Sequence, residues 1–118
     1  YISEEFEGLS RETFINAVEA EGIPVCPGYR APLQEYALFA GDVGSLDGES
    51  GYSIASPNGA IKYSKMETPV ASRLCANEAV TLSQSVFLGP REDMDSIVEA
   101  IAKVRENAGK LVGAGKTV

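Results

Sequence analysis

The sequence predicts an α+β fold, in which a small sheet of short strands is covered by about three helices and carries a glycine-rich hairpin insertion. Three observations lead to this fold class. Apolar residues recur at helical spacing in three segments, 10–21, 69–78 and 91–107. Short apolar or alternating stretches lie between them, and residues 40–66 are rich in glycine. A chain of 118 residues that is 44% hydrophobic is expected to form one core.

The first predicted elements are a strand within "YISEEFEGLS" and the helix over 10–21. Ser10 is a good N-cap residue, because its hydroxyl oxygen can accept a hydrogen bond from a free amide of the first helical turn. Leu9 and Phe14 are placed to form a hydrophobic staple around this cap. The sequence therefore predicts where this helix begins.

The end of the same helix is marked by Gly22, which can adopt the left-handed conformation that ends many helices. Ile23 is then positioned to contact Val18, as in a Schellman motif, and Pro24 prevents the helix from continuing. We therefore expect this helix to end at a fixed point.

Residues 40–66 are predicted to form a flexible insertion that contains a small hairpin. Asn58 and Gly59 are a favoured pair for a two-residue type I′ turn. The residues expected to flank this turn are Tyr52, Ile54, Ile61 and Tyr63.

The second helix is predicted from Pro69 to Glu78, with Thr68 as its cap. Proline is tolerated at the first helical position, because the backbone N–H that it lacks would have no partner within the helix there. Its inward-facing residues are expected to be Val70, Ala71, Leu74 and Cys75. The alternating and then apolar segment 80–88 predicts a strand.

The last predicted helix covers 91–107, with acidic residues in its first turn and basic residues near its end, as the helix dipole favours. Its expected buried stripe consists of Met94, Ile97, Val98, Ile101 and Val104. Residues 109–118 are expected to be a flexible tail, so the predicted domain covers 1–108.

Charge and composition exclude several classes of function. The net charge of −7 disfavours nucleic acid and anionic membranes as partners, because both are bound through clustered lysine and arginine. No apolar run has the length of about 20 residues that spans a bilayer, and the N-terminus has no signal-peptide pattern. From these features we expect a cytoplasmic protein.

The chain contains no histidine, which excludes histidine-based catalytic triads and leaves too few ligands for a structural zinc site. Cys26 and Cys75 are expected to be reduced thiols packed as small hydrophobic groups, although one disulfide is formally possible. We assign no catalytic residue and no metal ligand to this chain.

The stretch "GIPVCPGYRAPL" is the strongest candidate for a binding site, because binding residues often lie on loops that rigid elements hold in place. It holds three prolines around Tyr29 and Arg30 and directly follows the first helix. From the residues alone, two interpretations stay open: a loop that faces a ligand, or a buried structural turn.

Two blocks of the sequence, 8–39 and 68–107, resemble the C-terminal region of the DegT/StrS sugar and cyclitol aminotransferases. The phrases that carry the resemblance are "AEGIP", "GYRAPL", "PVASRLCANEAV" and "EDMDSIVEAIAKV", in this order and spacing. Gly28 and Gln34 stand where many sugar-specific members carry histidine, which favours the cyclitol branch of the family.

This resemblance implies the small domain of a fold type I enzyme that depends on pyridoxal phosphate. Such enzymes move an amino group from an amino acid, often glutamate or glutamine, to a keto sugar or keto cyclitol. The family's large domain carries the Schiff-base lysine and the cofactor, and the whole enzyme is a homodimer. We therefore expect no cofactor and no activity in the 118 residues alone.

In this interpretation the small domain forms one wall of the substrate cleft. The residues expected to bind substrate are Tyr29, Arg30, Pro32 and Leu33. Because the sequence begins with Tyr1 instead of methionine, we expect it to be a piece of a larger protein. The alternative is a free-standing, non-enzymatic α+β domain that senses a ligand or binds another protein.

Overall fold

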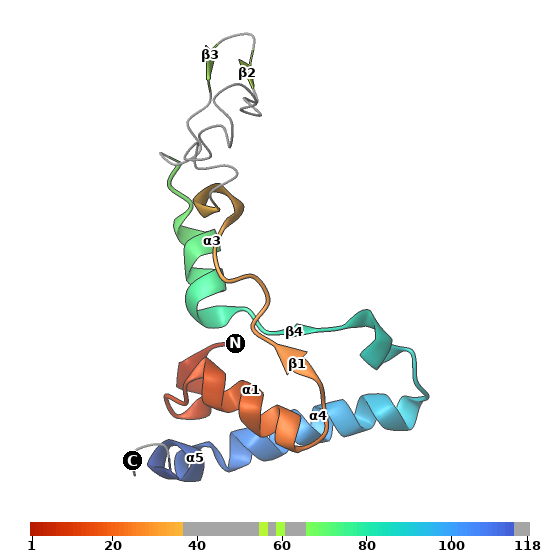
Figure 1. Cartoon of the computed structure of the whole chain (residues 1–118). Helices are drawn as coiled ribbons and strands as arrows, with labels where there is room; N and C mark the ends of the chain where they lie inside the picture. The colour runs from red at the N-terminus through yellow and green to blue at the C-terminus, as the bar shows by residue number, and fades with distance from the viewer. Residues whose placement is uncertain (37–54, 57–58, 61–65, 115–118) are drawn as a thin grey trace. The chain divides into compact units, whose positions relative to one another are not determined.

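The fold class predicted from the sequence is confirmed: a computed structural model shows a small α+β protein that is mostly helical (Figure 1). The structure describes residues 1–36, 55–56, 59–60 and 66–114. The α-helices are α1 (Arg11–Ala20), α3 (Pro69–Arg73), α4 (Arg91–Glu106) and α5 (Ala108–Ala114). The strands are β1 (Val25–Cys26), β2 (Ala55–Ser56), β3 (Gly59–Ala60) and β4 (Thr81–Leu82). None of the described helices is long and apolar enough to cross a membrane.

The chain divides into two compact units, and the domain over 1–108 stays a prediction. Residues 1–28 and 77–118 form unit 1, and residues 29–76 form unit 2. Unit 1 is thus built from the two ends of the chain, and unit 2 is inserted between them.

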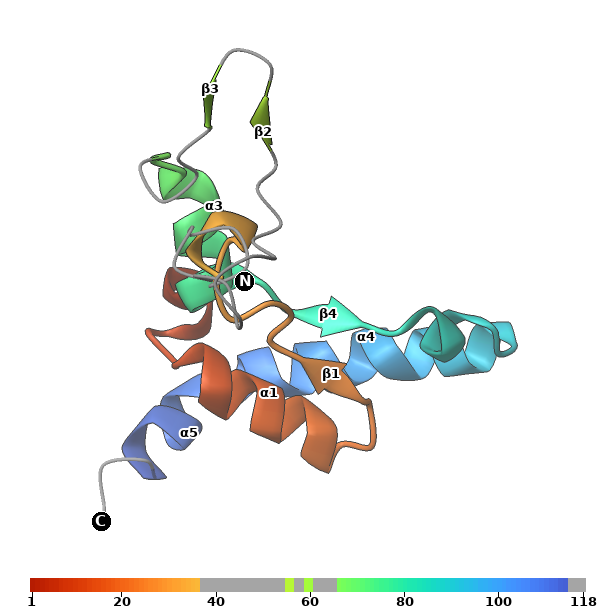
Figure 2. The same cartoon turned by 45° about the horizontal axis from the view of Figure 1, so that its top comes forward.

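Unit 1 is a two-stranded antiparallel sheet that packs on helices (Figure 2). Strands β1 and β4 pair with Val25 opposite Leu82 and Cys26 opposite Thr81. Successive strand residues point to opposite faces. Val25 is accordingly buried in the core with residues of α1 and α4, whereas Cys26 and Thr81 are exposed.

Both predicted ends of α1 are confirmed. The amide of Thr13 donates a hydrogen bond of 3.1 Å to the Ser10 hydroxyl oxygen, which is the cap interaction that the sequence predicts. At the other end Gly22 has a φ of 90°, and the amides of Gly22 and Ile23 donate to the carbonyls of Glu19 and Val18. These two bonds define a Schellman motif.

The hydrophobic core of unit 1 joins α1, β1 and α4. Its buried residues are Leu9, Phe14, Ile15, Val18, Val25 and Val104. Tyr1, Phe6 and Phe14 add a cluster of three aromatic rings, with centroids between 4.7 and 5.1 Å apart. Each ring pair adds about 1 kcal/mol beyond the area that it buries.

Three predictions at the ends of the chain are wrong. Residues Ser3–Phe6 form a 3₁₀ helix where we predicted a strand. Val98, predicted to be buried, is 66% exposed, and Ala100 is buried instead. The predicted tail from residue 109 begins as helix α5, in which Ala108 is fully buried.

The strand predicted over 80–88 is too long. Only Thr81–Leu82 pair as β4, and Gln84–Phe87 form a 3₁₀ helix. An apolar run of this kind does not by itself distinguish strand from helix.

The hairpin in the insertion is present, but its register is one residue earlier than predicted. Strands β2 and β3 pair with Ser56 opposite Gly59, so Gly59 belongs to a strand and not to the turn. The predicted flanking residues Tyr52, Ile54, Ile61 and Tyr63 lie outside the described residues, and the flexibility of 40–66 stays a prediction.

The second predicted helix is present, but two of the apolar residues that we expected to be buried are exposed. Helix α3 starts with Pro69 at its first turn, as predicted, and continues into a π-helical turn over Leu74–Glu78. Thr68 makes no side-chain cap bond; its hydroxyl instead accepts a hydrogen bond from the Gln34 side chain. Val70 and Leu74, predicted to face inward, are 58% and 42% exposed.

Candidate functional site

The candidate loop leaves unit 1 at a position that glycine alone fits well. Gly28 follows β1, has a φ of 75°, and a Cβ atom there would lie 3.0 Å from the Thr81 hydroxyl oxygen. Both the left-handed backbone and the close approach of β4 disfavour a side chain. The backbone conformation of Gly28, from which the "YRAPL" segment starts, is therefore fixed by its contacts in unit 1.

The structure brings the four predicted substrate-binding residues together in one short segment of unit 2, but it does not expose all of them. Tyr29 is 75% exposed and Leu33 is 64% exposed. Arg30 is exposed too, whereas Pro32 is buried. Pro32 is thus buried and the other three side chains are exposed, and the role of all four in binding substrate stays a prediction.

The base of this loop is held within unit 2. Leu33–Glu35 form a single 3₁₀ turn, and Gln34 donates a hydrogen bond from its side chain to Thr68. The Ser72 hydroxyl lies 3.4 Å from a carboxylate oxygen of Glu35. These contacts join the turn to the start of α3, so the exposed residues before it are attached to a helix at one end and to β1 at the other.

Unit 2 also exposes several large apolar side chains, and no pattern in the sequence predicted their exposure. They are Tyr29, Leu33, Tyr36, Met66, Val70 and Leu74, each at least 40% exposed. Helical spacing predicted that Val70 and Leu74 face inward, but a spacing pattern does not say whether anything covers an apolar face.

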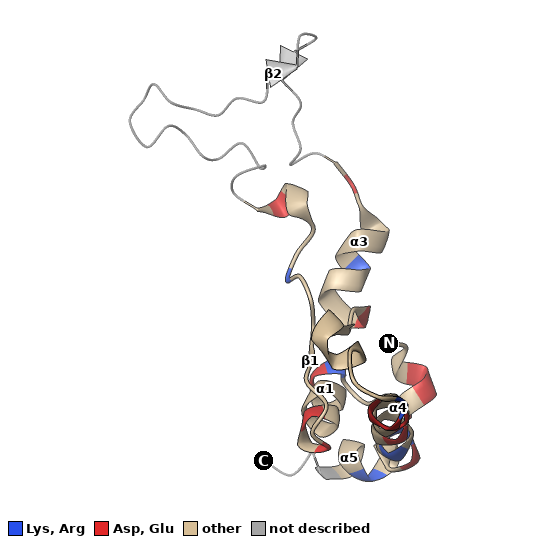
Figure 3. Ribbon diagram, turned by 90° about the vertical axis from the view of Figure 1, so that its right-hand side faces the viewer, with Lys and Arg blue, Asp and Glu red and all other residues tan. Residues whose placement is uncertain are grey.

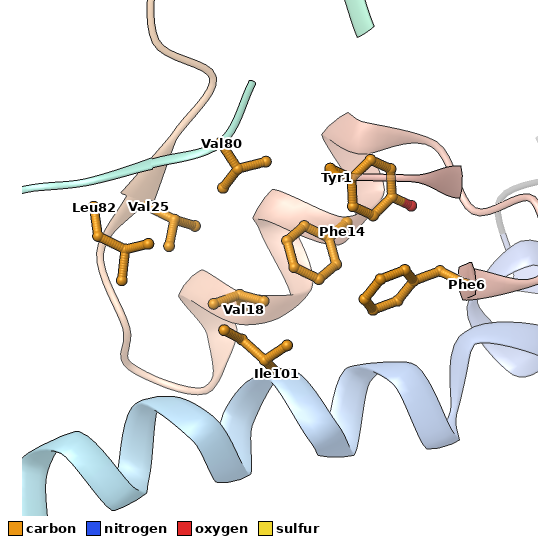
Figure 4. Close-up of a pocket in the computed structure, with 8 residues that line it drawn as sticks. All are labelled: Tyr1, Phe6, Phe14, Val18, Val25, Val80, Leu82 and Ile101. Carbon is orange, nitrogen blue, oxygen red and sulfur yellow. The ribbon is translucent and has the colours of Figure 1, made fainter. Parts of the chain in front are cut away.

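An apolar cavity of about 210 Å³ lies in unit 1 (Figure 4). Its lining comes from the N-terminal segment, α1, the two strands and α4. The lining residues are Tyr1, Phe6, Phe14, Val18, Val25, Val80, Leu82 and Ile101. Burial, with a smaller contribution from Glu4, raises the pKa of the Tyr1 phenol above its ordinary value of 10.0. No sequence signal predicted this cavity.

Charged residues lie along α1 and α4 of unit 1 (Figure 3). Two exposed ion pairs join residues of α4 to other segments of this unit. The Lys103 ammonium lies 2.6 Å from the Glu21 carboxylate, and the Arg105 guanidinium lies 2.9 Å from that of Glu5. Exposed pairs contribute about 0–1 kcal/mol each. Within the part of the chain that the structure describes, no three metal-binding side chains lie together, and Cys26 and Cys75 form no disulfide. Cys26 is exposed, so its predicted packing in the core is wrong.

Comparisons with known proteins identify relatives of the chain. It is 33% identical over 108 residues to an L-glutamine:3-amino-2,3-dideoxy-scyllo-inosose aminotransferase of Streptomyces kanamyceticus. Proteins of the same name from Streptoalloteichus tenebrarius and Micromonospora echinospora are 32% identical over 114 residues and 28% identical over 111 residues.

These matches cover 90–92% of this chain but 25% of each relative, so the chain spans about a quarter of the length of the curated proteins that it matches. No protein-family model and no solved structure matches it. The resemblance to aminotransferases that the sequence predicted is confirmed by these relatives.

Proposed function

We propose that this chain, a relative of cyclitol aminotransferases, is the small C-terminal domain of an enzyme of that kind. The whole enzyme would use pyridoxal phosphate to move an amino group from glutamine or glutamate to a keto cyclitol or keto sugar. The observation that carries the proposal is the match over 90% of this chain to a quarter of an aminotransferase that is named for glutamine and an inosose.

The described residues do not fit a site for pyridoxal phosphate. That cofactor needs a lysine for its Schiff base and an acidic partner for its ring nitrogen. The Lys103 ammonium donates to Glu21 at 2.6 Å and the Lys110 ammonium donates to Asn107 at 2.8 Å, and both bonds lie at the exposed surface. We therefore assign cofactor binding to the large domain of the same protein and derive no step of the reaction from this chain.

The proposed role of the "YRAPL" loop is to bind substrate at one wall of the cleft. The exposed Arg30 guanidinium offers paired donors that suit the carboxylate of an amino-acid donor. The exposed Tyr29 phenol can donate to, or accept from, the hydroxyl groups of a cyclitol ring. Leu33 adds an apolar contact, and the buried Pro32 holds the loop in place without touching substrate.

The large domain and a second copy of the protein are the proposed partners of this domain. The exposed large apolar residues of unit 2 support this, because such side chains mark an interaction site where they gather into one patch. In this proposal the large domain covers Val70 and Leu74, and the cleft forms between the two domains.

The test is to express the whole protein from its gene and to measure amine transfer from glutamine to a keto cyclitol by mass spectrometry of the product. We expect transfer by the whole protein with pyridoxal phosphate and none by the 118-residue chain, which serves as the control. Transfer by the 118-residue chain would contradict the assignment of the chemistry to another domain. A reading frame that starts just before Tyr1 would instead favour the free-standing binding domain.

A further inference from the structure

We propose that Gln34 is a positioning residue of the substrate site. Its side-chain amide is bound to the Thr68 hydroxyl, and this bond sets where the turn Leu33–Glu35, and Arg30 before it, are held. The inference rests on the proposed function and deepens it, because Gln34 acts on the amino donor through Arg30 and does not touch it. All of these residues belong to unit 2.

The turn Leu33–Glu35 needs an anchor outside itself. Its backbone bonds run from the Glu35 amide to the Pro32 carbonyl at 3.0 Å and from the Tyr36 amide to the Leu33 carbonyl at 3.1 Å. The hydrogen-bond geometry of a 3₁₀ turn is poor, and a single helical turn is unfavourable on its own in water. A bond to a distant segment is therefore needed to keep this turn in one place.

Thr68 provides that bond from a position 34 residues later in the chain, where α3 begins beside the turn (Figure 1). The Thr68 carbonyl accepts a hydrogen bond of 2.9 Å from the Ser72 amide, so its backbone is joined to the first turn of α3. Its side chain is branched at Cβ, which restricts rotation about χ1. The hydroxyl makes no cap bond to its own helix, although threonine often does so at this position. The Thr68 hydroxyl is thus a well-placed acceptor that serves Gln34 instead of α3.

A second side-chain contact between the turn and α3 is weaker. The Ser72 hydroxyl lies 3.4 Å from the Glu35 carboxylate at the exposed surface, which is longer than an ordinary bond between two oxygen atoms. Gln34 and Thr68 are both partly buried, so water competes less for their bond. Thr68 and Ser72 therefore offer a matched pair of hydroxyls on one helix, of which the first should matter more.

Proline passes the fixed position of Gln34 back to Arg30. Pro32 is buried and has a φ of −59°, and its ring prevents rotation about that bond. Proline also restricts the residue before it, Ala31, to extended conformations. Few rotatable backbone bonds thus separate Gln34 from Arg30. Because a binding side chain must be held close to its productive geometry, an exposed arginine depends on the backbone that carries it.

The first test examines the 118-residue chain by NMR and needs no activity. We expect a nuclear Overhauser effect between the Gln34 side-chain amide protons and the Thr68 side chain, and its absence would overturn the proposal. Thr68→Val removes the acceptor but keeps the shape, and it should speed hydrogen exchange of the Tyr36 amide by about fivefold. Thr68→Ser keeps the hydroxyl and should retain the slower exchange. Ser72→Ala is the matched control, and an effect as large as that of Thr68→Val would contradict the role of Gln34.

The second test measures steady-state kinetics of the whole enzyme. We expect Thr68→Val to raise KM for the amino donor by about fivefold, the loss of one neutral hydrogen bond, with kcat nearly unchanged. Gln34→Ala removes the donor of the same bond and should act alike, whereas Thr68→Ser should restore KM. A merely structural role would lower the fraction of folded enzyme, so kcat would fall while KM stayed the same. That result would overturn the proposal.

A double-mutant cycle tests whether the effect passes through Arg30. In an Arg30→Ala enzyme, adding Thr68→Val should not raise KM further, because the residue that the bond positions is already absent. A further fivefold rise would overturn the proposal. An inactive whole protein would contradict the proposed function, whereas an active enzyme in which Thr68→Val leaves KM unchanged would contradict the positioning role alone.

Discussion

The Tyr1 phenol donates a hydrogen bond of 2.6 Å to the backbone carbonyl of Leu9. Leu9 is 1% exposed and directly precedes the N-cap of α1, so the bond joins the first residue to the start of the first long helix. The Tyr1 ring also packs 4.7 Å from that of Phe14 on the same helix. Tyr1 is thus a structural residue of unit 1.

The stability of unit 1 should fall in alkaline solution because of this tyrosine. Burial raises the pKa of the Tyr1 phenol above 10.0, so the folded protein binds the proton more tightly than the unfolded chain. The resulting stabilisation is present below pH 10 and is lost as the pH rises from 10 through the higher folded pKa. Melting temperatures measured from pH 8 to 11 should show this loss, which Tyr1→Phe should reduce. Tyr29→Phe changes an exposed phenol and should leave the loss intact; equal effects of the two variants would contradict the assignment.

Removing the N-cap hydroxyl should destabilise α1. Ser10→Ala leaves the Thr13 amide without its side-chain acceptor, and we expect the free energy of unfolding to fall by about 1 kcal/mol. The matched control is Ser3→Ala, since the Ser3 hydroxyl makes only an exposed bond to Glu4. Urea denaturation of both variants measures the difference, and a cost at Ser3 as large as that at Ser10 would show that the cap is unimportant.

A side chain at the end of α1 should be poorly tolerated. Gly22 has a φ of 90°, so Gly22→Ala places an L-residue in the left-handed region at a cost of about 1–2 kcal/mol. Gly113→Ala is the control, because nothing lies within 4 Å of the new Cβ atom and alanine favours the helix of α5. We expect thermal denaturation to show a loss for the first variant and no loss for the second.

Shortening the side chain at two adjacent positions of α4 should change the free energy of unfolding by very different amounts. Ile97 is 7% exposed, and Ile97→Ala should lower the free energy of unfolding by about 2–5 kcal/mol. Val98 is 66% exposed, and Val98→Ala should change it by less than about 0.5 kcal/mol. If Val98→Ala proves costly in the whole protein but not in the 118-residue chain, another domain covers this side of α4.

Arg30 should matter for transfer and not for folding. In the whole enzyme we expect Arg30→Ala to lower kcat/KM for the amino donor by about 10- to 100-fold, the loss of one charged hydrogen-bond partner. Arg91→Ala removes the same charge from a side chain that is 90% exposed on α4, and it should leave kcat/KM unchanged. The melting temperatures of both variants should match that of the unmodified enzyme. A normal kcat/KM for Arg30→Ala would remove Arg30 from the proposed site.

The sequence predicted those features whose signals are local. The cap at Ser10, the left-handed Gly22 and the proline at the start of α3 each act within one helical turn, and all three are present. The loop around Tyr29 was also identifiable, because prolines and glycines restrict or free the backbone wherever they stand.

The features that the sequence did not predict depend on contacts between distant segments. The inward face expected for Val70 and Leu74 is not observed, since the two side chains are 58% and 42% exposed. The burial of Ala108 and of Pro32 likewise depends on packing, since neither residue type signals its own environment. The cavity behind Tyr1 is formed by several elements and follows no local pattern.

The pairing of β1 with β4 bears on how the inserted unit can change in length. Residues 29–76 leave unit 1 after Gly28 and return before β4, and Gly28 lies close enough to Thr81 that a Cβ atom would be 3.0 Å from its hydroxyl. Gly28, which precedes unit 2, and Ala79 and Thr81, which follow it, are thus held close together within unit 1. The entropy of closing a loop grows only with the logarithm of its length, so doubling the insertion would cost about 0.6 kcal/mol. Residues can therefore be added to or removed from the segment between β1 and β4 with little effect on the stability of unit 1.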